Sequence, residues 1–340
     1  MNIHEVARAS GVSVATVSRV INHPELVAEK TRTRVLAILE QTRYTPNTET
    51  RVHAGKRKQG IALIIPSLLE YRMTPDGVRQ IGNAKNYGVQ LCVTNYDESE
   101  LNRNVRSLAA QQVDGVILAA QIGYEGAYRT LREAGIPVVC INAAKRSGNE
   151  DNCYINYGES ARKLAQYAVE SGNQSAVLLL SDKYSGCREK LEKGFRETWS
   201  IAGRPESSLK TVNTEESFKG GSQTAEKLFS EKVLPDLIVT QYDEMAVGVM
   251  KTAHEQGVIV PDQLHIMGFF DSPISSAVLP ELTSIEQPTY RLGVASARRL
   301  FDIMEDQEYF DVESQEIVLK GRLKIRRSCG NSKTIYELYD

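Results

Sequence analysis

The 340-residue sequence lacks any apolar run of about 18 residues, the length that a membrane-spanning helix requires. Its first residues, MNIHEVARAS, also lack the apolar central stretch and the small-residue cleavage site of a signal peptide. We therefore expect a cytoplasmic protein that makes no membrane contact. The hydrophobic content of 41% and the charged content of 25% are typical of a soluble chain with a full core.

Cysteine and histidine are scarce, and the common catalytic motifs are missing. The five cysteines are an odd number without a CxxC pair, which favours reduced, mostly buried thiols. The five histidines show no metal-ligand spacing. The patterns GxSxG, GxxxxGK[ST], GxGxxG and HExxH do not occur. We therefore expect no metal, no cofactor and no enzyme activity, although α/β lobes in general host many enzymes.

The net charge of −2 conceals an uneven distribution along the chain. Residues 1–60 contain ten Lys and Arg but only five Asp and Glu, whereas the rest contains 31 basic and 38 acidic residues. A basic head on an acidic body indicates that the head contacts a polyanion such as nucleic acid.

The pattern of polar and apolar residues changes near residue 60. Residues 1–45 show helical periods, and residues 46–59 form a polar stretch that is typical of a linker. Seven apolar runs then alternate with helical stretches: IALIIP, VQLCVT, DGVILAA, IPVVCIN, AVLLLS, DLIVT and LHIMGFF. Such runs predict parallel strands covered on both faces. Seven strands suggest two doubly wound α/β lobes with a break near residue 157, followed by a helix at about 289–306 and the strand-like run EIVLKGRLKI.

The stretch GVSVATVSRVIN, residues 11–22, is rich in β-branched residues but has helical spacing. Val17, Val20 and Ile21 recur at i, i+3 and i+4, and Ser13 is a good N-cap for such a helix. Gly11 can adopt the positive φ of a tight turn after a first short helix. With a third helix at about 29–42, this layout predicts a helix-turn-helix unit with a three-helix core.

The second helix of such a unit enters the DNA major groove by its N-terminal end. Arg19 can form paired hydrogen bonds with guanine, and Val14 and Ala15 can contact a thymine methyl group. Other polar side chains of this helix can hold phosphates, which fixes the register on the duplex. These contacts come from Ser13, Thr16, Ser18 and Asn22.

The whole pattern resembles the lactose-repressor/galactose-repressor (LacI/GalR) family of bacterial transcription regulators. The resemblance continues through TRTRVLAILEQTRYTPN, VDGVIL, AGIPVV, DEMAVG, LPELTSIEQP and LKIRRS, as far as residue 328. It implies a repressor of carbohydrate-metabolism genes that binds a pseudo-palindromic double-stranded operator as a homodimer, with a tetramer as the alternative. It also implies a body like a periplasmic sugar-binding protein, with a small effector, a sugar or sugar derivative, in the cleft between its lobes.

The resemblance assigns parts of the chain and individual contacts. It implies a headpiece at 1–45, a hinge at 46–59 and an effector-binding and dimerisation domain at 60–328. In that domain, lobe 1 covers about 60–157 and 289–320, and lobe 2 covers about 158–285, whereas the tail 329–340 has no predicted role. Base-reading positions are matched by Val14, Ala15 and Arg19. Backbone-contact positions are matched by Ser13, Thr16, Ser18, Asn22, Thr31, Tyr44 and Asn47.

The effector cleft departs from the family pattern. Leu191, Tyr242 and Phe270 stand where the family has polar sugar-binding residues. The best remaining candidates for effector contacts are Ser67, Asn142, Arg188, Asp243 and Asp271. One interpretation is a different sugar, or an acidic or phosphorylated one held by Arg188 and Arg72. The alternative is control by a partner protein.

The hinge departs from the family pattern as well. The family usually has Pro-Asn-x-x-Ala-Arg-Ser-Leu, whose leucine inserts into the minor groove, but residues 46–53 read PNTETRVH. His53 therefore occupies the wedge position. An apolar wedge unstacks a base step and kinks the duplex, and an imidazole is a poorer wedge. We expect a hinge helix that bends the operator less, unless the copy from a second subunit compensates.

His53→Leu is accordingly expected to increase the operator bend and the preference for the central bases of the operator. Gel-shift assays on circularly permuted operator fragments measure the bend for both proteins. Equal bends and equal central-base preferences would contradict this reading and favour compensation by the second subunit.

Overall fold

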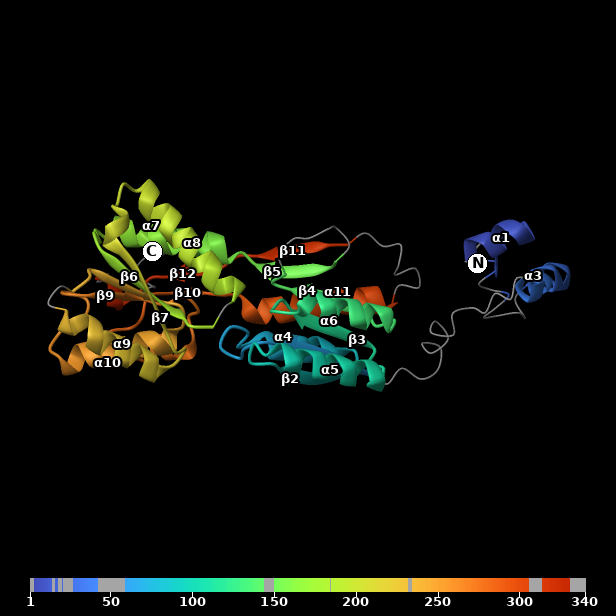
Figure 1. Cartoon of the computed structure of the whole chain (residues 1–340), viewed down its shortest axis with the longest axis horizontal. Coiled ribbons are helices and arrows are strands. Elements are labelled where there is room, and N and C mark those ends of the chain that lie inside the picture. The colour runs from blue at the N-terminus through green and yellow to red at the C-terminus, as the bar shows by residue number, and fades with distance from the viewer. Residues whose placement is uncertain are drawn as a thin grey trace. The chain divides into compact units, whose positions relative to one another are not determined.

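The computed structural model describes residues 3–13, 16–17, 20, 27–41, 59–143, 150–183, 185–231, 234–305 and 314–330. The chain divides into two compact units, Met1–Lys58 and Gln59–Asp340. The smaller unit contains helix α1 (Ile3–Ser10) and helix α3 (Glu29–Gln41), with helical residues at 16–17 and 20 between them (Figure 1). None of the described helices combines the length and apolar character needed to cross a bilayer.

The first part of the larger unit, lobe 1, is built on a six-stranded parallel sheet in the order β11-β5-β4-β3-β1-β2. The strands are β1 (Gly60–Ile65), β2 (Gly88–Val93), β3 (Gly115–Ala119), β4 (Val138–Ile141), β5 (Asn152–Ile155) and β11 (Glu316–Leu319). The helices are α4 (Thr74–Ala84), α5 (Glu98–Gln111), α6 (Tyr124–Glu133) and α11 (Thr289–Glu305). Helices α5 and α6 cover one face of the sheet, and α4 and α11 cover the other.

Lobe 2 is built on a four-stranded parallel sheet in the order β7-β6-β8-β9. Its strands are β6 (Ala176–Ser181), β7 (Leu209–Thr214), β8 (Leu237–Thr240) and β9 (His265–Met267). Its helices are α7 (Tyr157–Glu170), α8 (Gly186–Ile201), α9 (Phe218–Ser230) and α10 (Asp243–Glu255). Three short 3-10 helices, η3 (Glu206–Ser208), η4 (Pro273–Ser276) and η6 (Arg327–Cys329), complete the lobe together with the antiparallel pair β10 (Ser284–Glu286) and β12 (Arg322–Lys324).

The chain passes between the lobes three times: after β5, between β10 and α11, and between β11 and β12 (Figure 1). A buried ion pair fixes the return to lobe 1. Arg299 on α11 donates to Asp151 before β5 at 2.6 Å, and Asp151 also accepts the backbone N–H of Gln315 before β11. Loops that follow the carboxyl ends of both sheets meet at the junction, where Arg72 after β1 pairs with Glu244 after β8.

The predicted fold class, a helical headpiece and two doubly wound α/β lobes, is confirmed, and all seven apolar runs form strands. The sequence interpretation nevertheless missed three strands, namely β5, β7 and the three-residue β10. Strand β5 has only four residues, and strand β7 (LKTVNT) is a polar strand at the edge of its sheet. The run EIVLKGRLKI is divided between β11 in lobe 1 and β12 in lobe 2.

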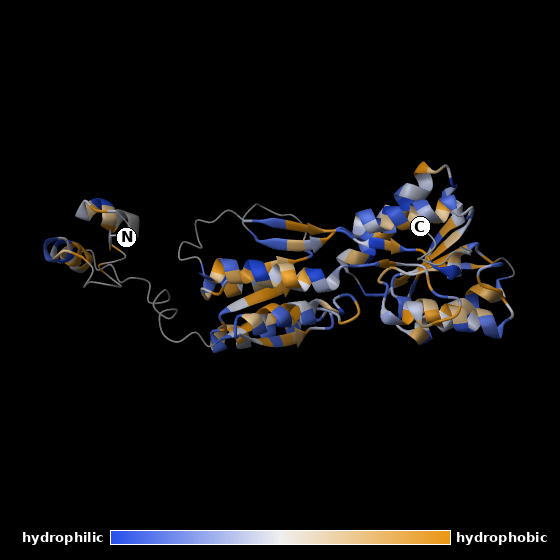
Figure 2. Cartoon of the chain, turned by 180° about the vertical axis from the view of Figure 1, so that it is seen from behind, coloured by the Kyte–Doolittle hydropathy of each residue, from blue (hydrophilic) through white to orange (hydrophobic). Residues whose placement is uncertain are grey.

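Apolar residues concentrate on the strands and on the inner sides of the helices (Figure 2). In strand β1, successive residues from Ile61 to Ile65 point to opposite faces of the sheet, and all are buried. This explains why the strand is a continuous apolar run rather than an alternating one. The five cysteines are free and buried, as predicted.

Helices α9 and α10 approach each other through glycines. A Cβ atom at Gly248 would lie 2.1 Å from the carbonyl oxygen of Phe218 and 2.7 Å from the backbone nitrogen of Ser222. Both neighbours are backbone atoms, so only separation of the two helices could relieve such a contact. By contrast, a Cβ atom at Gly126 in α6 would meet nothing within 4 Å.

Gly248→Ala should therefore destabilise the protein by about 1–3 kcal/mol, the usual cost of overpacking. The matched variant Gly126→Ala should stabilise it by roughly 0.5–1 kcal/mol because alanine favours the helix. Urea unfolding followed by circular dichroism measures both changes. A Gly248→Ala protein as stable as wild type would show that α9 and α10 are not closely packed at this position.

Candidate functional site

The turn of the headpiece has the geometry that the sequence predicts. Gly11 has a φ of +62°, in the left-handed region that glycine tolerates. Its N–H donates to the carbonyl oxygen of Arg8, and the N–H of Val12 donates to that of Ala7. These bonds satisfy carbonyl groups at the end of α1 and turn the chain toward the second helix.

Ser13 caps the second helix. Its hydroxyl oxygen accepts the N–H of Thr16 at 3.2 Å, and the two hydroxyl groups lie 2.8 Å apart. The Ser13 side chain is exposed, and Thr16 is half-buried. Thr31 is half-buried in the first turns of α3, where its N–H donates to the carbonyl oxygen of Ala28. These three predicted backbone contacts thus lie at or near the N-terminal ends of helices, which favour anions.

The headpiece core is small and apolar. Val17 and Val20 are buried against α1 and α3, together with Val6, Ala7 and Val35. The remaining predicted DNA contacts lie outside the described residues: Val14, Ala15, Ser18, Arg19, Asn22, Tyr44, Asn47 and His53. Burial of Val17 and Val20 thus defines the inner side of the second helix.

In the body, all five predicted effector residues follow carboxyl ends of strands. Ser67 follows β1, and its hydroxyl oxygen accepts the N–H of Leu69 at 3.1 Å. Asn142 follows β4 with a φ of +54°. Its amide group donates to the hydroxyls of Tyr71 and Tyr157 and accepts the N–H of Ile155. Both side chains therefore already have partners within the protein.

The charged members of this set are also engaged. Arg188 donates to the carbonyl oxygen of Ser181 at 2.9 Å and to Asn213 at 2.8 Å. Asp271 pairs with Arg326 at 2.6 Å, where both side chains are largely buried. The predicted residues thus follow carboxyl ends of strands and hold the loops there in place, and Asp271 also lines the cavity described below.

Asp243 is completely buried at the start of α10. It accepts the N–H of Ser272 at 2.5 Å and the hydroxyl of Ser284 at 2.8 Å. Burial raises the pKa of this carboxyl above its usual range, and the two hydrogen bonds partly oppose that shift. Asp243 therefore ties the loop after β9 to strand β10.

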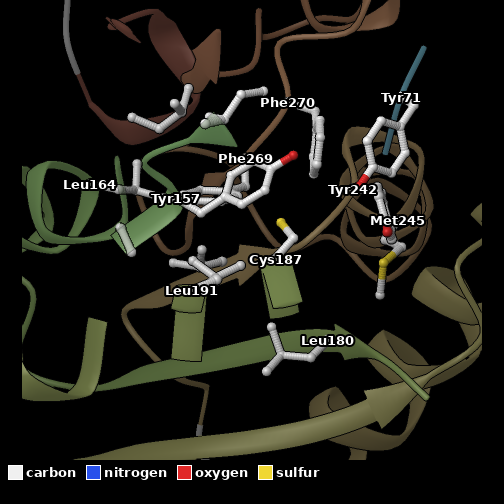
Figure 3. Packing of buried hydrophobic residues seen from close by; sticks show 14 of the residues in the cluster. Tyr71, Tyr157, Leu164, Leu180, Cys187, Leu191, Tyr242, Met245, Phe269 and Phe270 are labelled. Atoms are coloured by element: carbon white, nitrogen blue, oxygen red, sulfur yellow. The ribbon is translucent and has the colours of Figure 1, made fainter. Parts of the chain in front are cut away.

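Aromatic side chains occupy the space between the lobes. Tyr71 from lobe 1 and Tyr157, Tyr242, Phe269 and Phe270 from lobe 2 gather in one cluster (Figure 3). The rings of Tyr242 and Phe270 stack with centroids 5.2 Å apart. Figure 3 also shows Cys187 and Leu191 of α8 in this cluster. The positions that depart from the family pattern, Leu191, Tyr242 and Phe270, are thus buried parts of the interlobe core.

Two acidic residues between the lobes were missed by sequence reasoning. Arg72 of lobe 1 forms an ion pair with Glu244 of lobe 2. Glu70, in the same loop as Arg72, is only 3% exposed and accepts the hydroxyl of Tyr96 at 3.1 Å. Burial raises the pKa of Glu70 to about 7. The available signal was an acid in the run LLEYR, in the loop that follows the carboxyl end of the buried strand β1.

A cavity of about 360 Å³ opens at the lobe junction beside the aromatic cluster. It is lined by residues of both lobes and of the crossing segments, including Arg72, Phe270, Ser272, Gln287, Tyr290 and Arg322. A cavity of about 540 Å³ lies around Trp199 and Ile201 at the end of α8. The junction cavity has the better placement for an effector because its ligand would contact both lobes. Among the described residues, no three His, Cys, Asp or Glu side chains are placed to hold a metal ion.

Comparisons with known proteins agree with both units. Residues 2–47 match the family described as bacterial regulatory proteins, lacI family. Residues 165–329 match the periplasmic binding protein-like domain. Catabolite control protein A of Priestia megaterium is 29% identical over 336 residues, which cover 96% of this chain and 99% of that protein. Catabolite control protein A of Staphylococcus epidermidis is 28% identical, with 96% and 98% covered.

Solved structures share the fold along the chain. The lac repressor dimer bound to operator has a TM-score of 0.72 and 23% identity, covering 97% of this chain and 99% of that chain. The regulator CelR in complex with cellobiose has a TM-score of 0.70 and 24% identity, with 96% and 99% covered. A turn, a capped second helix and a buried core at the N-terminus thus occur together with a periplasmic binding protein-like body. The chain belongs to the LacI/GalR family of bacterial transcriptional regulators.

Proposed function

We propose that this regulator represses carbohydrate-metabolism genes by binding a pseudo-palindromic operator as a homodimer in the cytoplasm. Residues 1–45 would read the DNA, residues 46–59 would form the hinge, and residues 60–328 would bind the effector and dimerise. No catalytic step is needed for this function. The supporting observation is the capped, turned second helix, whose inner side is fixed by Val17 and Val20.

A sugar or sugar derivative at the lobe junction is the proposed effector. The body has the fold of the lac repressor, and its crossing segments lie beside a cavity of about 360 Å³. Both observations support this choice. Related folds have been solved with sugars: CelR with cellobiose, and a LacI-family regulator of Enterococcus faecium with ribose. Of the five residues that the sequence predicts for effector contacts, Asp271 lines this cavity, whereas the contacts of Ser67, Asn142, Arg188 and Asp243 suggest that they hold neighbouring loops in place.

Coupling between effector binding and operator binding would pass through the three crossing segments. A ligand that changes the angle between the lobes would displace the lobe 1 surfaces of the dimer. This would change the free energy of ordering the two hinge segments on DNA.

The decisive experiment is to find the operator by in vitro selection and then to compare wild type with Arg19→Ala. Loss of paired hydrogen bonds to guanine should weaken operator binding by about 1–3 kcal/mol, or roughly 5- to 150-fold, with less effect on random DNA. Fluorescence anisotropy at several salt concentrations measures both affinities. Wild-type binding should also weaken steeply as salt rises.

A fragment of residues 59–340 is the matched control. It should lose operator binding and retain thermal stabilisation by any sugar that stabilises the full chain, by roughly 2.7 kcal/mol at 100 times the dissociation constant. Operator binding by this fragment would refute the proposed division of labour. A wild-type dimer without preference for any duplex would refute the function itself.

A further inference from the structure

Glu70 is a buried carboxyl with side chains of both lobes around it. It lies in the loop between β1 and α4, and 3% of it is exposed. Tyr96 of lobe 1 donates its hydroxyl to Glu70 at 3.1 Å, and Ser185 at the start of α8 in lobe 2 lies near the carboxyl. Glu70 is therefore enclosed only while the lobes are together.

No cation compensates the charge of this carboxyl at close range. Of the two lobe 2 charges that act on Glu70, the acidic Glu216 has the larger effect, and it disfavours ionisation of Glu70. Lys183 pairs with Glu216 at 2.9 Å, and Arg72 pairs with Glu244. Within the described part of the chain, no Lys or Arg forms an ion pair with Glu70.

The other groups facing Glu70 carry little compensating charge. Lys190 of α8 attracts the carboxylate only at a distance, and its ammonium lies 5.9 Å from the ring centroid of Tyr154. The neighbouring titratable groups are neutral because burial raises their pKa values. They are Tyr71 of the same loop, Tyr96 after β2, Tyr157 of α7, Cys187 of α8 and Tyr242 before α10.

An ionised carboxyl in such a place is costly, since desolvation penalises the charged form. Separation of the lobes would remove Ser185 and Glu216 and admit water to Glu70. The carboxyl would then ionise freely. The closed arrangement consequently favours the neutral form of Glu70, and the open arrangement favours the carboxylate.

We propose that closure of the two lobes is coupled to the uptake of one proton from water by Glu70. Acidification would then favour the closed form, and a rise in pH would favour opening. This regulation rests on the function proposed above, in which the angle between the lobes controls operator binding. The proton is held on the Glu70 carboxyl between the lobes and returns to water when they separate.

The sign and range follow from the two states of the carboxyl. Its pKa is about 7 in the closed form and 4.5 at full hydration. The closed-to-open ratio is therefore highest below pH 4.5 and falls as pH rises through about 7. Between about pH 5.5 and about pH 8.5, these values correspond to a decrease of roughly 30-fold.

The test measures lobe separation in the full-length dimer by pulsed electron spin resonance. Spin labels are attached at Arg129→Cys on α6 and Lys219→Cys on α9, both exposed positions, while the five native cysteines are buried. Excess unlabelled protein ensures that each labelled dimer has one labelled subunit. We expect the ratio of the short-distance to the long-distance population to fall about 30-fold from pH 5.5 to pH 8.5.

Glu70→Gln should keep the lobes closed at both pH values, because the amide is neutral. The control Glu244→Gln breaks the ion pair with Arg72, so it should reduce closure at both pH values while preserving the pH dependence. Tyr96→Phe, a variant close in shape to wild type, removes a hydrogen bond that favours ionisation of Glu70. In Tyr96→Phe, the closed population should therefore begin to decline at a higher pH than in wild type. This variant tests the proposal even if Glu70→Gln does not fold.

A closed population that is independent of pH in wild type, or an unchanged decline in Glu70→Gln, would overturn the proposal. So would a Tyr96→Phe profile identical to wild type. Operator affinity and sugar response, measured in the same preparations, separate this result from the proposed function. The protein could bind its operator and respond to a sugar while the separation of its lobes does not change with pH. That result would contradict only the proton coupling and would leave the proposed function intact.

Discussion

The junction between the lobes depends on one constraint: loops that follow the carboxyl ends of two parallel sheets meet there. Every loop that follows a strand there must satisfy its polar groups within a shared interface. Asp243 does so by binding Ser272 and Ser284, and Asn142 does so by binding Tyr71 and Tyr157. Residues that resemble ligand contacts in the sequence are therefore also the residues that hold the loops in place.

The same constraint explains the aromatic cluster. A hexose site needs paired polar groups for each hydroxyl, because a buried group without a partner costs about 1–3 kcal/mol. At Leu191, Tyr242 and Phe270 this chain has apolar or aromatic side chains, and all three are buried. The closed junction is thus stabilised by burial of apolar surface, and a ligand would act beside this cluster, at the cavity lined by Phe270.

The headpiece is organised differently because it is so small. Its core consists of a few valines and Ala7, so local features must contribute a large part of its stability. The Ser13 cap and the left-handed Gly11 are such features, and both act within a few residues along the chain. A small unit of this kind suits a DNA-binding domain, since contacts with phosphates can stabilise its folded state.

Sequence by itself determined the parts of the protein that depend on nearby residues. The turn at Gly11, the cap at Ser13 and the buried stripe of Val17 and Val20 follow from helical period and residue chemistry. Likewise, strands β1 and β6 could be predicted from their own residues alone, because strands buried on both faces are continuously apolar.

Only the tertiary structure decided features that depend on distant pairing. Strands β5 and β7 are short or polar, and they are strands because β4 and β6 supply their partners. The division of EIVLKGRLKI between the lobes depends on β5 and β10. The raised pKa of Glu70 depends on its burial and on Glu216, which lies more than a hundred positions away. Sequence sets local conformation through near neighbours, whereas the charge state of a buried side chain is set by whatever the fold places around it.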